Sequence, residues 1–132
     1  MTVAANVEFV RRAYEAITTA DMPWMAEHTA DDVVFHQGGR FPTAGTYKGR
    51  DAMFGHFMEF MTLVDGKFTL DLVDVLASDD RAAAVLSVTI EYQGRQLRFD
   101  EVHLWRLDGD KLVEMHALPF EPYEVDAFFA GA

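Results

Sequence analysis

Residues that could transfer protons stand at two separate places in the chain. Glu101 and His103 are two positions apart in the segment "RFDEVHLWRL", so a β-strand there would point both side chains to the same face. His36 ends the apolar run "VVFH", directly before the glycine-rich segment "QGGRFPTAG". Imidazole exchanges protons near neutral pH and a neighbouring carboxylate can orient it, so these residue types suit general acid–base catalysis.

The strand predicted at residues 96–107 has two unlike faces. One face carries charged residues such as Arg98 and Asp100. The other face is apolar except for Glu101 and His103, and we expect it to be the covered face; its apolar members are Leu97, Phe99, Trp105 and Leu107. An ionisable group is costly to bury unless it is paired or hydrogen-bonded. The two residues are therefore either a satisfied polar pair or part of a functional site.

Other candidate residues are less well defined by their surroundings. Glu114 and His116 share one face of the strand predicted at residues 111–118, but both faces of that strand mix polar and apolar residues, and Glu114 could instead pair with a surface cation. The direction of His36 is open because the three residues before it are all apolar. Tyr14 lies on the apolar stripe of the first predicted helix, where a buried, hydrogen-bonded tyrosine is also ordinary.

The elements that must position these residues begin with helices. Apolar residues recur at spacings of three and four over residues 3–19 and again over residues 50–63, which predicts two amphipathic helices. Asp21 suits the N-cap of a short helix between them. A short strand at residues 32–37 and an irregular glycine- and proline-rich segment at residues 38–49 lie before the second long helix.

The second half of the chain is rich in strand-forming residues. Turn signals divide it into four predicted strands, and a short final helix follows them; the strands cover residues 67–77, 82–93, 96–107 and 111–118. Helices first and antiparallel strands second indicate an α+β domain, in which the sheet curls around the helices. The chain shows no repeat or linker, so we expect one domain over residues 1–132.

Composition excludes several classes of function. Half of the 132 residues are hydrophobic, which is enough for a core, and the net charge of −11 argues against binding to nucleic acid or to an anionic membrane. No apolar stretch approaches the roughly 20 residues that span a bilayer. The absence of cysteine excludes disulfides and is compatible with the cytoplasm, and the N-terminus predicts an amphipathic helix rather than a signal peptide, so we expect a cytoplasmic protein.

The order of elements resembles the nuclear transport factor 2 superfamily, whose cystatin-like fold wraps a cone-shaped, curved antiparallel sheet around N-terminal helices. The segment "HQGGRFPTAGTYKG" looks like the pattern of SnoaL-like polyketide cyclases, a histidine or acid followed by "G-x-x-P-x-x-G-x-Y-x-G". It is also similar to ketosteroid isomerases, where an aspartate stands first. This resemblance implies a single SnoaL-like or ketosteroid isomerase-like domain, with His36 at the position of the isomerase's catalytic base.

The resemblance also implies roles for other residues. Tyr14 falls where the isomerases keep the tyrosine that donates to the substrate oxygen, and His103 falls at their protonated aspartate. His116 falls at a pocket-facing position of the last strand. Because both acidic positions of the isomerase site are histidine here, the resemblance implies related acid–base chemistry on a different substrate.

We therefore expect a cofactor-independent acid–base enzyme, an isomerase, aldol-type cyclase or dehydratase, acting on a small hydrophobic carbonyl compound. His36 or His103 would remove a proton next to the carbonyl, and Glu101 would orient His103. Tyr14, with the other histidine, would donate hydrogen bonds to the enolate oxygen. The expected pocket lining, for which core packing is the alternative role, comprises Trp24, Phe35, Met53, Phe57, Met61, Phe99, Trp105 and His116.

Two other kinds of function stay open. The same cone could bind a small molecule without catalysis or act as an interaction domain. A metal site is a further alternative, with imidazole and carboxylate ligands drawn from His36, His103, His116 and Glu101 or Glu114. No pair of histidines shows the helical spacing of a metal motif, so we expect no metal and no cofactor.

A homodimer is also expected. The outer face of the predicted sheet carries Val102 and Leu104 among charged residues. Proteins that this chain resembles commonly pair through that face, so the expected partners are a small hydrophobic molecule and a second copy of the chain.

Overall fold

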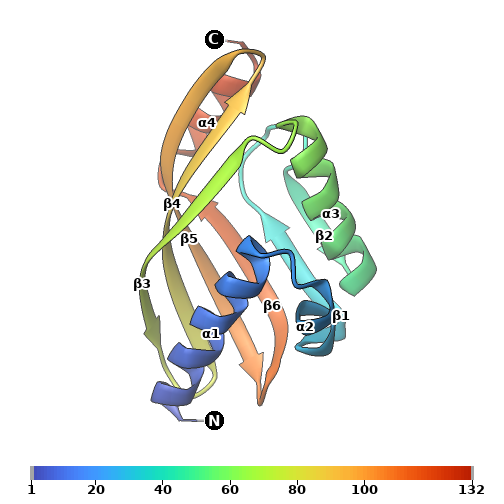
Figure 1. Ribbon diagram of the computed structural model, residues 1–132, viewed down its shortest axis with the longest axis vertical. Coiled ribbons are helices and arrows are strands. Elements are labelled where there is room, and N and C mark those ends of the chain that lie inside the picture. The colour runs from blue at the N-terminus through green and yellow to red at the C-terminus, as the bar shows by residue number, and fades with distance from the viewer. Residues whose placement is uncertain (1, 132) are drawn as a thin grey trace.

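The computed structural model describes residues 2–131, and Figure 1 shows helices packed against one curved sheet. The helices are α1 (Val3–Thr18), α2 (Met22–Glu27), α3 (Arg50–Leu63) and α4 (Pro122–Phe129). The strands are β1 (Thr29–Gln37), β2 (Gly45–Lys48), β3 (Phe68–Ala77), β4 (Arg81–Tyr92), β5 (Arg95–Asp108) and β6 (Lys111–Pro119). Every helix and strand predicted from the sequence is present, and the α+β fold class is confirmed.

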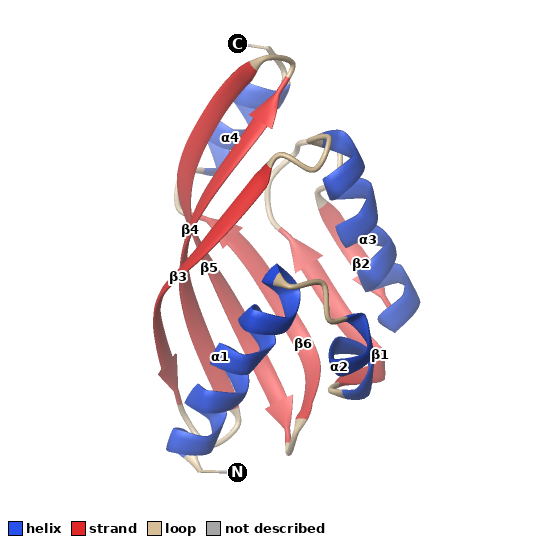
Figure 2. Ribbon diagram, in the orientation of Figure 1, coloured by secondary structure: helices blue, strands red, loops and turns tan. Residues whose placement is uncertain are grey.

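The six strands lie in the order β2-β1-β6-β5-β4-β3. Strands β3 to β6 form the predicted antiparallel meander, and β1 extends it by pairing parallel to β6. Register shifts within β3 and between β5 and β6 mark irregularities of the bulge type, which increase strand twist. The sheet therefore curves, and Figure 2 shows α1 and α3 lying across the same side of it. We call this side the inner face.

The segment predicted to be irregular contains one strand that the sequence did not reveal. β2 has four residues and pairs antiparallel with β1, with Thr46 opposite His36. Such a short strand between glycines carries too little alternation to be recognised. Before β2, the Arg40 amide donates to the Asp126 carboxylate at 2.7 Å and the Phe41 ring stacks on Phe129, so this segment is fastened to α4.

Helix α1 is held against the inner face by the apolar stripe seen in its sequence. Val10 and Ala13 are completely buried, and Tyr14 on the same stripe is 3% exposed. Asn6 is also buried, and its side-chain amide donates to two backbone carbonyls in the turn after β3 at 2.9 Å each. The helix therefore has a fixed position over the sheet, which fixes Tyr14 as well.

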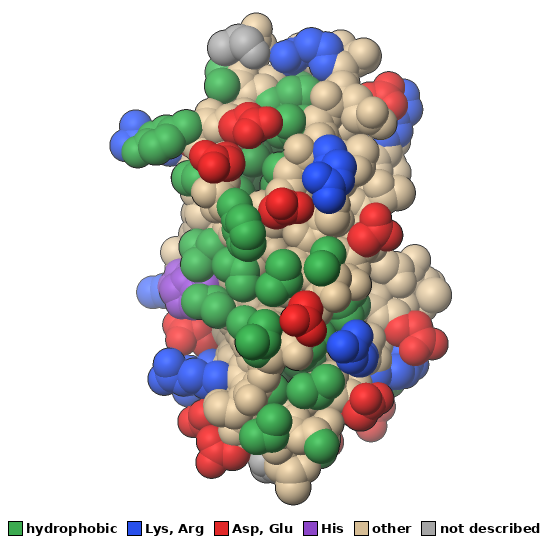
Figure 3. Space-filling model, turned by 90° about the vertical axis from the view of Figure 1, so that its left-hand side faces the viewer, with side chains coloured by type: hydrophobic (Ala, Val, Ile, Leu, Met, Phe, Trp, Pro, Cys, Tyr) green, Lys and Arg blue, Asp and Glu red, His purple; other side chains and the backbone are tan. Residues whose placement is uncertain are grey.

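The opposite side of the sheet, the outer face, exposes apolar side chains. Val73 and Leu76 on β3 and Leu104 on β5 are 64%, 57% and 42% exposed. Figure 3, which looks at the β3 side of the molecule, shows hydrophobic side chains gathered among acidic and basic ones. The homodimer expected through this face stays a prediction. Within residues 2–131, no helix has both the length and the apolar character to cross a membrane.

Candidate functional site

A mostly apolar cavity of about 110 Å³ lies between the inner face of the sheet and the helices. Phenylalanine and methionine side chains make up much of its wall, and residues of all four helices contribute to it. Among the described residues that line it, those with polar or ionisable side chains are Gln37, His56, Glu101 and His103. A ligand in this cavity would thus meet an apolar wall with polar groups at a few positions, as is usual for small-molecule sites.

The structure places five of the predicted lining residues in the cavity wall: Phe35, Met53, Phe57, Met61 and Phe99. Trp24 and Trp105 lie elsewhere, so their prediction as lining residues is wrong. Trp24 stacks on His28 at the end of α2, with ring centroids 4.1 Å apart, and contacts Phe9 of α1, with ring centroids 5.5 Å apart. Trp105 is 2% exposed and lies behind the wall, where it contacts Tyr14.

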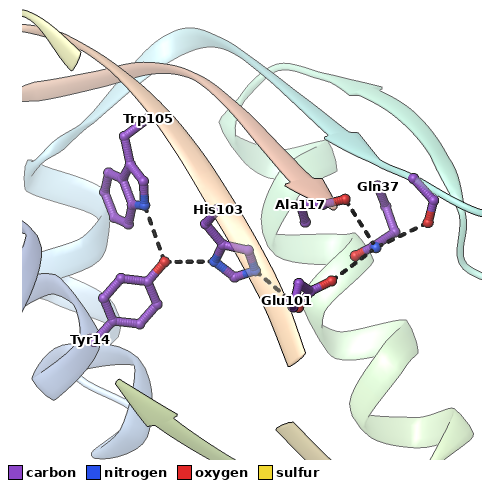
Figure 4. Close-up of polar contacts among 7 residues, drawn as sticks. Tyr14, Gln37, Glu101, His103, Trp105 and Ala117 are labelled. Carbon is purple, nitrogen blue, oxygen red and sulfur yellow. Dashed lines mark hydrogen bonds and ion pairs between the residues drawn. The ribbon is translucent and has the colours of Figure 1, made fainter. Parts of the chain in front are cut away.

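A chain of hydrogen bonds runs from the core to the cavity wall (Figure 4). The Trp105 indole N–H donates to the Tyr14 hydroxyl oxygen at 3.1 Å, and this hydroxyl lies 2.6 Å from His103 Nδ1. His103 Nε2 lies 3.2 Å from Glu101 Oε2, and the Gln37 amide donates to Glu101 Oε1 at 3.4 Å. Helix α1 and strands β1 and β5 therefore meet at one polar chain, which we call the inner chain.

The donors in the inner chain determine where its protons lie. The Trp105 indole can only donate, so the Tyr14 oxygen accepts from it and the Tyr14 proton is free to point at His103 Nδ1. His103 then carries its own proton on Nε2 and donates it to the Glu101 carboxylate. This assignment, made from the hydrogen-bond network, gives the polar side-chain atoms of Trp105, Tyr14 and His103 matching partners.

Burial controls the chemistry of the inner chain. The pKa of Tyr14 is raised well above its usual value, mainly by burial and further by the negative charge of Glu101, while the Trp105 hydrogen bond opposes the rise. Tyr14 therefore remains a neutral donor at physiological pH. Glu101 is only 7% exposed, and a buried carboxylate needs the hydrogen bonds that His103 and Gln37 supply.

His56 is a site residue that the sequence reasoning missed. It lies on α3, lines the cavity and is 7% exposed, and its Nε2 has no hydrogen-bond partner. Burial lowers its pKa to about 4 despite the opposing effect of Glu101, so the ring is neutral. A sequence signal existed: His56 follows Met53 by three positions and precedes Phe60 by four, so it shares the stripe that faces the cavity.

The prediction that His36 converges with Tyr14 and His103 on the cavity is wrong. Side chains alternate along β1, and Phe35 and Gln37 occupy the inward positions, so His36 points to the outer face. Its Nδ1 lies 3.1 Å from the Thr46 hydroxyl and its Nε2 lies 3.1 Å from Glu114 Oε2. His36 therefore cannot serve as a base in the cavity.

His116 also lies on the outer face, which corrects its predicted place in the pocket. The parallel register sets it beside His36, and the two imidazole rings stack with centroids 4.2 Å apart. Its neighbours Met115 and Ala117 take the buried positions of β6. His36, Glu114 and His116 each offer one possible metal-ligating atom, and these atoms lie within 4.8 Å of one another.

Comparison with known proteins agrees with this architecture. At 29% identity, Bal32a from a soil-derived mobile gene cassette superposes with a TM-score of 0.90, covering 96% of this chain and 98% of that chain. IdmH from Streptomyces antibioticus, a candidate polyketide cyclase, shares the fold at 18% identity with a TM-score of 0.74 over 95% of this chain and 97% of IdmH. Other solved neighbours are described as cystatin-like or NTF2-like.

Sequence comparison places the chain in a family. The uncharacterized protein Rv0034 of Mycobacterium tuberculosis is 26% identical over 131 residues, which is 98% of this chain and 100% of Rv0034. The model of the SnoaL-like domain matches residues 10–115, a stretch that runs from within α1 to within β6 and contains the whole inner chain. The chain therefore belongs to the SnoaL-like domain family and has the nuclear transport factor 2-like fold of its solved neighbours.

Proposed function

We propose that this protein is a cofactor-independent acid–base enzyme that acts on a small hydrophobic carbonyl compound bound in the cavity. The observation that carries the proposal is the inner chain, in which an indole, a phenol and an imidazole lead in sequence to the Glu101 carboxylate at an apolar wall. Burying so many polar groups in a row is costly for a core that only has to be stable. Perturbed and linked ionisable groups beside a cavity are instead common at active sites.

Among the residues of the inner chain, Glu101 is the one best able to receive a proton. Both ring nitrogens of His103 are engaged, whereas each carboxylate oxygen keeps a free lone pair beside the one used by His103 or Gln37. Glu101 would take the proton from the carbon next to the carbonyl, leaving an enolate, and would return it to a different atom of the substrate. His103 is a positioning residue here, because its N–H holds the carboxylate in place.

The substrate class follows from the cavity wall. Its phenylalanine and methionine side chains favour an apolar, partly aromatic molecule, and methionine adapts to irregular shapes. His56 adds a neutral imidazole whose unpartnered Nε2 could accept a hydrogen bond from a ligand hydroxyl. The candidate polyketide cyclase IdmH, which shares the fold, suggests carbonyl-rich compounds as the first substrates to test.

One observation favours a second function, small-molecule binding without catalysis. Most polar atoms of the inner chain already satisfy one another, so the inner chain could serve as a rigid polar anchor. In that case ligands would bind and no proton would be exchanged.

The test is the exchange of ligand C–H protons with solvent deuterium, followed by NMR for cyclic ketones, enones and β-diketones. Glu101→Gln keeps the shape of the side chain but removes the base, and we expect exchange to slow by about 100-fold or more. The matched control is Asp100→Asn on the outward face of the same strand, which should exchange as the wild type does. Binding without exchange would support the second function, and unchanged exchange in Glu101→Gln would rule out the proposed base.

A further inference from the structure

The outer face holds a second group of ionisable side chains that the proposed function does not use. His36 comes from β1, and Glu114 and His116 come from β6, the neighbouring strand. One donor atom from each residue lies within 4.8 Å of the other two. Four donors around a tetrahedral ion with bonds of about 2.1 Å are about 3.4 Å apart, so small side-chain rotations would bring these three to ligating distance.

The backbone of two paired strands fixes the positions of these three residues. β1 and β6 lie inside the six-stranded sheet, and their parallel register pairs His36 with His116 and Val34 with Glu114. The imidazole planes are within 15° of parallel, so the two rings stack face to face beside the Glu114 carboxylate, and a ring would turn for both nitrogens to point at one ion. All three side chains are partly buried, which limits the entropy lost on ligation.

The neighbouring groups orient the donors as outer-shell partners do in metal sites. The Thr46 hydroxyl contacts Nδ1 of His36 at 3.1 Å, which leaves Nε2 as the donor on the side of Glu114. Arg106 Nε lies 3.4 Å from Oε1 of Glu114, whereas Oε2 is the oxygen that faces His36.

We propose that His36, Glu114 and His116 form a binding site for a divalent transition-metal ion of the zinc class on the outer face of the sheet. Two imidazoles and one carboxylate are a donor set that Zn²⁺ accepts, with a fourth position left for water or another ligand. The same donors suit Co²⁺ and Ni²⁺ better than Mg²⁺ or Ca²⁺, which prefer oxygen ligands. The net charge of −11 favours a cation anywhere on this protein.

Such a site would act separately from the cavity. The metal would join β1 to β6 from outside, while the inner chain lies on the opposite face of the same sheet. Its expected effect is therefore structural, as stabilisation of the folded chain by a ligand that does not bind the unfolded one.

The test uses the full chain without an affinity tag. Zn²⁺ is titrated by calorimetry, and Co²⁺ is followed by the visible absorption that a four-coordinate ion gives. We expect one saturable equivalent, a rise in melting temperature, and binding at least about tenfold weaker in His36→Ala and in His116→Ala. Thr46→Val should weaken binding to a smaller extent, and His28→Ala on the α2 side should bind as the wild type does.

Two results would overturn the proposal. One is the absence of saturable binding to the wild-type chain, which would leave the group as a hydrogen-bonded surface cluster. The other is equal binding by the wild type, His36→Ala and His116→Ala, which would place the metal elsewhere. Circular dichroism of each variant establishes that it is folded, and exchange activity in the cavity is measured in parallel so that a failure of one site is distinguished from a failure of the other.

Discussion

Two histidine–glutamate pairs with nearly the same local geometry lie on opposite faces of one sheet. In the inner pair, His103 Nε2 is 3.2 Å from Glu101 Oε2, and in the outer pair His36 Nε2 is 3.1 Å from Glu114 Oε2. The inner side chains are 12% and 10% exposed, whereas the outer ones are 29% and 32% exposed. Because the distances are nearly equal, differences in chemistry and stability between the two pairs come from their surroundings.

The surroundings give the two pairs different chemistry. The inner pair is mostly buried and depends on Tyr14 and Gln37 for its remaining hydrogen bonds, so each member is costly to remove. The outer pair is partly solvated and shares its carboxylate with Arg106, so water can replace a missing partner. Proton transfer to a bound molecule suits the first arrangement, and exchange of a hydrogen bond for a metal ion suits the second.

The largest contrast is expected in the stability of two alanine variants. His103→Ala removes the imidazole that pairs with Glu101 Oε2 and with the Tyr14 O–H, both nearly buried, and we expect a loss of about 3 kcal/mol in the free energy of unfolding. His36→Ala should cost less than about 1 kcal/mol, because solvent reaches its partners. Urea denaturation with a chelator present measures the free energy of unfolding of both variants. The two values can be compared if the free energy depends on urea concentration with the same slope in each variant. Equal losses would show that burial does not distinguish the pairs.

The next effect concerns His56, the other histidine on the cavity side. Its pKa is lowered to about 4 in the folded protein, mainly by burial, and the negative charge of Glu101 opposes this lowering. Between that value and the unfolded pKa of about 6.5, the unfolded chain binds more protons, so stability falls as the pH drops through this range, by up to about 3 kcal/mol.

The measurement is the free energy of unfolding from pH 7 to pH 4. His56→Gln cannot be protonated, so it should lose most of this decline, whereas His28→Gln, away from the cavity, should keep it. A decline that persists unchanged in His56→Gln would mean that other groups cause the acid sensitivity.

The contrast between faces also explains which site residues could be predicted. Alternation along β5 was informative because one of its faces is charged, and it correctly placed Glu101 and His103 on the covered side. The helical stripe of α1 did the same for Tyr14. In each case polar residues on one side marked the apolar side as the buried one.

The rest could not be read from the sequence because this contrast was missing. Val34 and Phe35 are both apolar, so nothing in β1 showed that His36 faces outward. The resemblance to the isomerases assigned the position of the catalytic base to His36, whereas the residue that faces inward is its neighbour Gln37. On β6 the polar residues turned out to share the outer face, but its mixed composition hid this. The helical spacing of His56 from Met53 and Phe60 was a usable signal, but only the structure shows that this stripe of α3 lines a cavity.

A smaller effect is expected at the start of the inner chain. Tyr14→Phe removes one hydroxyl and leaves the Trp105 indole N–H and His103 Nδ1 without a partner, which should cost about 1–3 kcal/mol. Tyr123→Phe is the matched control, because Tyr123 is 85% exposed and its loss should change stability very little. The difference between the two phenylalanine variants in urea denaturation gives the contribution of the buried hydroxyl. A difference near zero would mean that Tyr14 contributes only its ring.

The smallest effect is expected at Glu114 in the outer pair. Its pKa is lowered in the folded protein, first by the hydrogen bond with His36, so its stabilising effect is present above the unfolded pKa near 4.5 and is lost as the pH falls through the lower folded value. Glu114→Gln should therefore flatten the acid limb of the stability curve below the range in which His56 acts. Because the pair is partly solvated, high salt should reduce the difference from the wild type, whereas the inner pair should be insensitive to salt. The exposed Glu8→Gln serves as the control, and a salt-independent effect of Glu114→Gln would place the outer pair in the same class as the inner one.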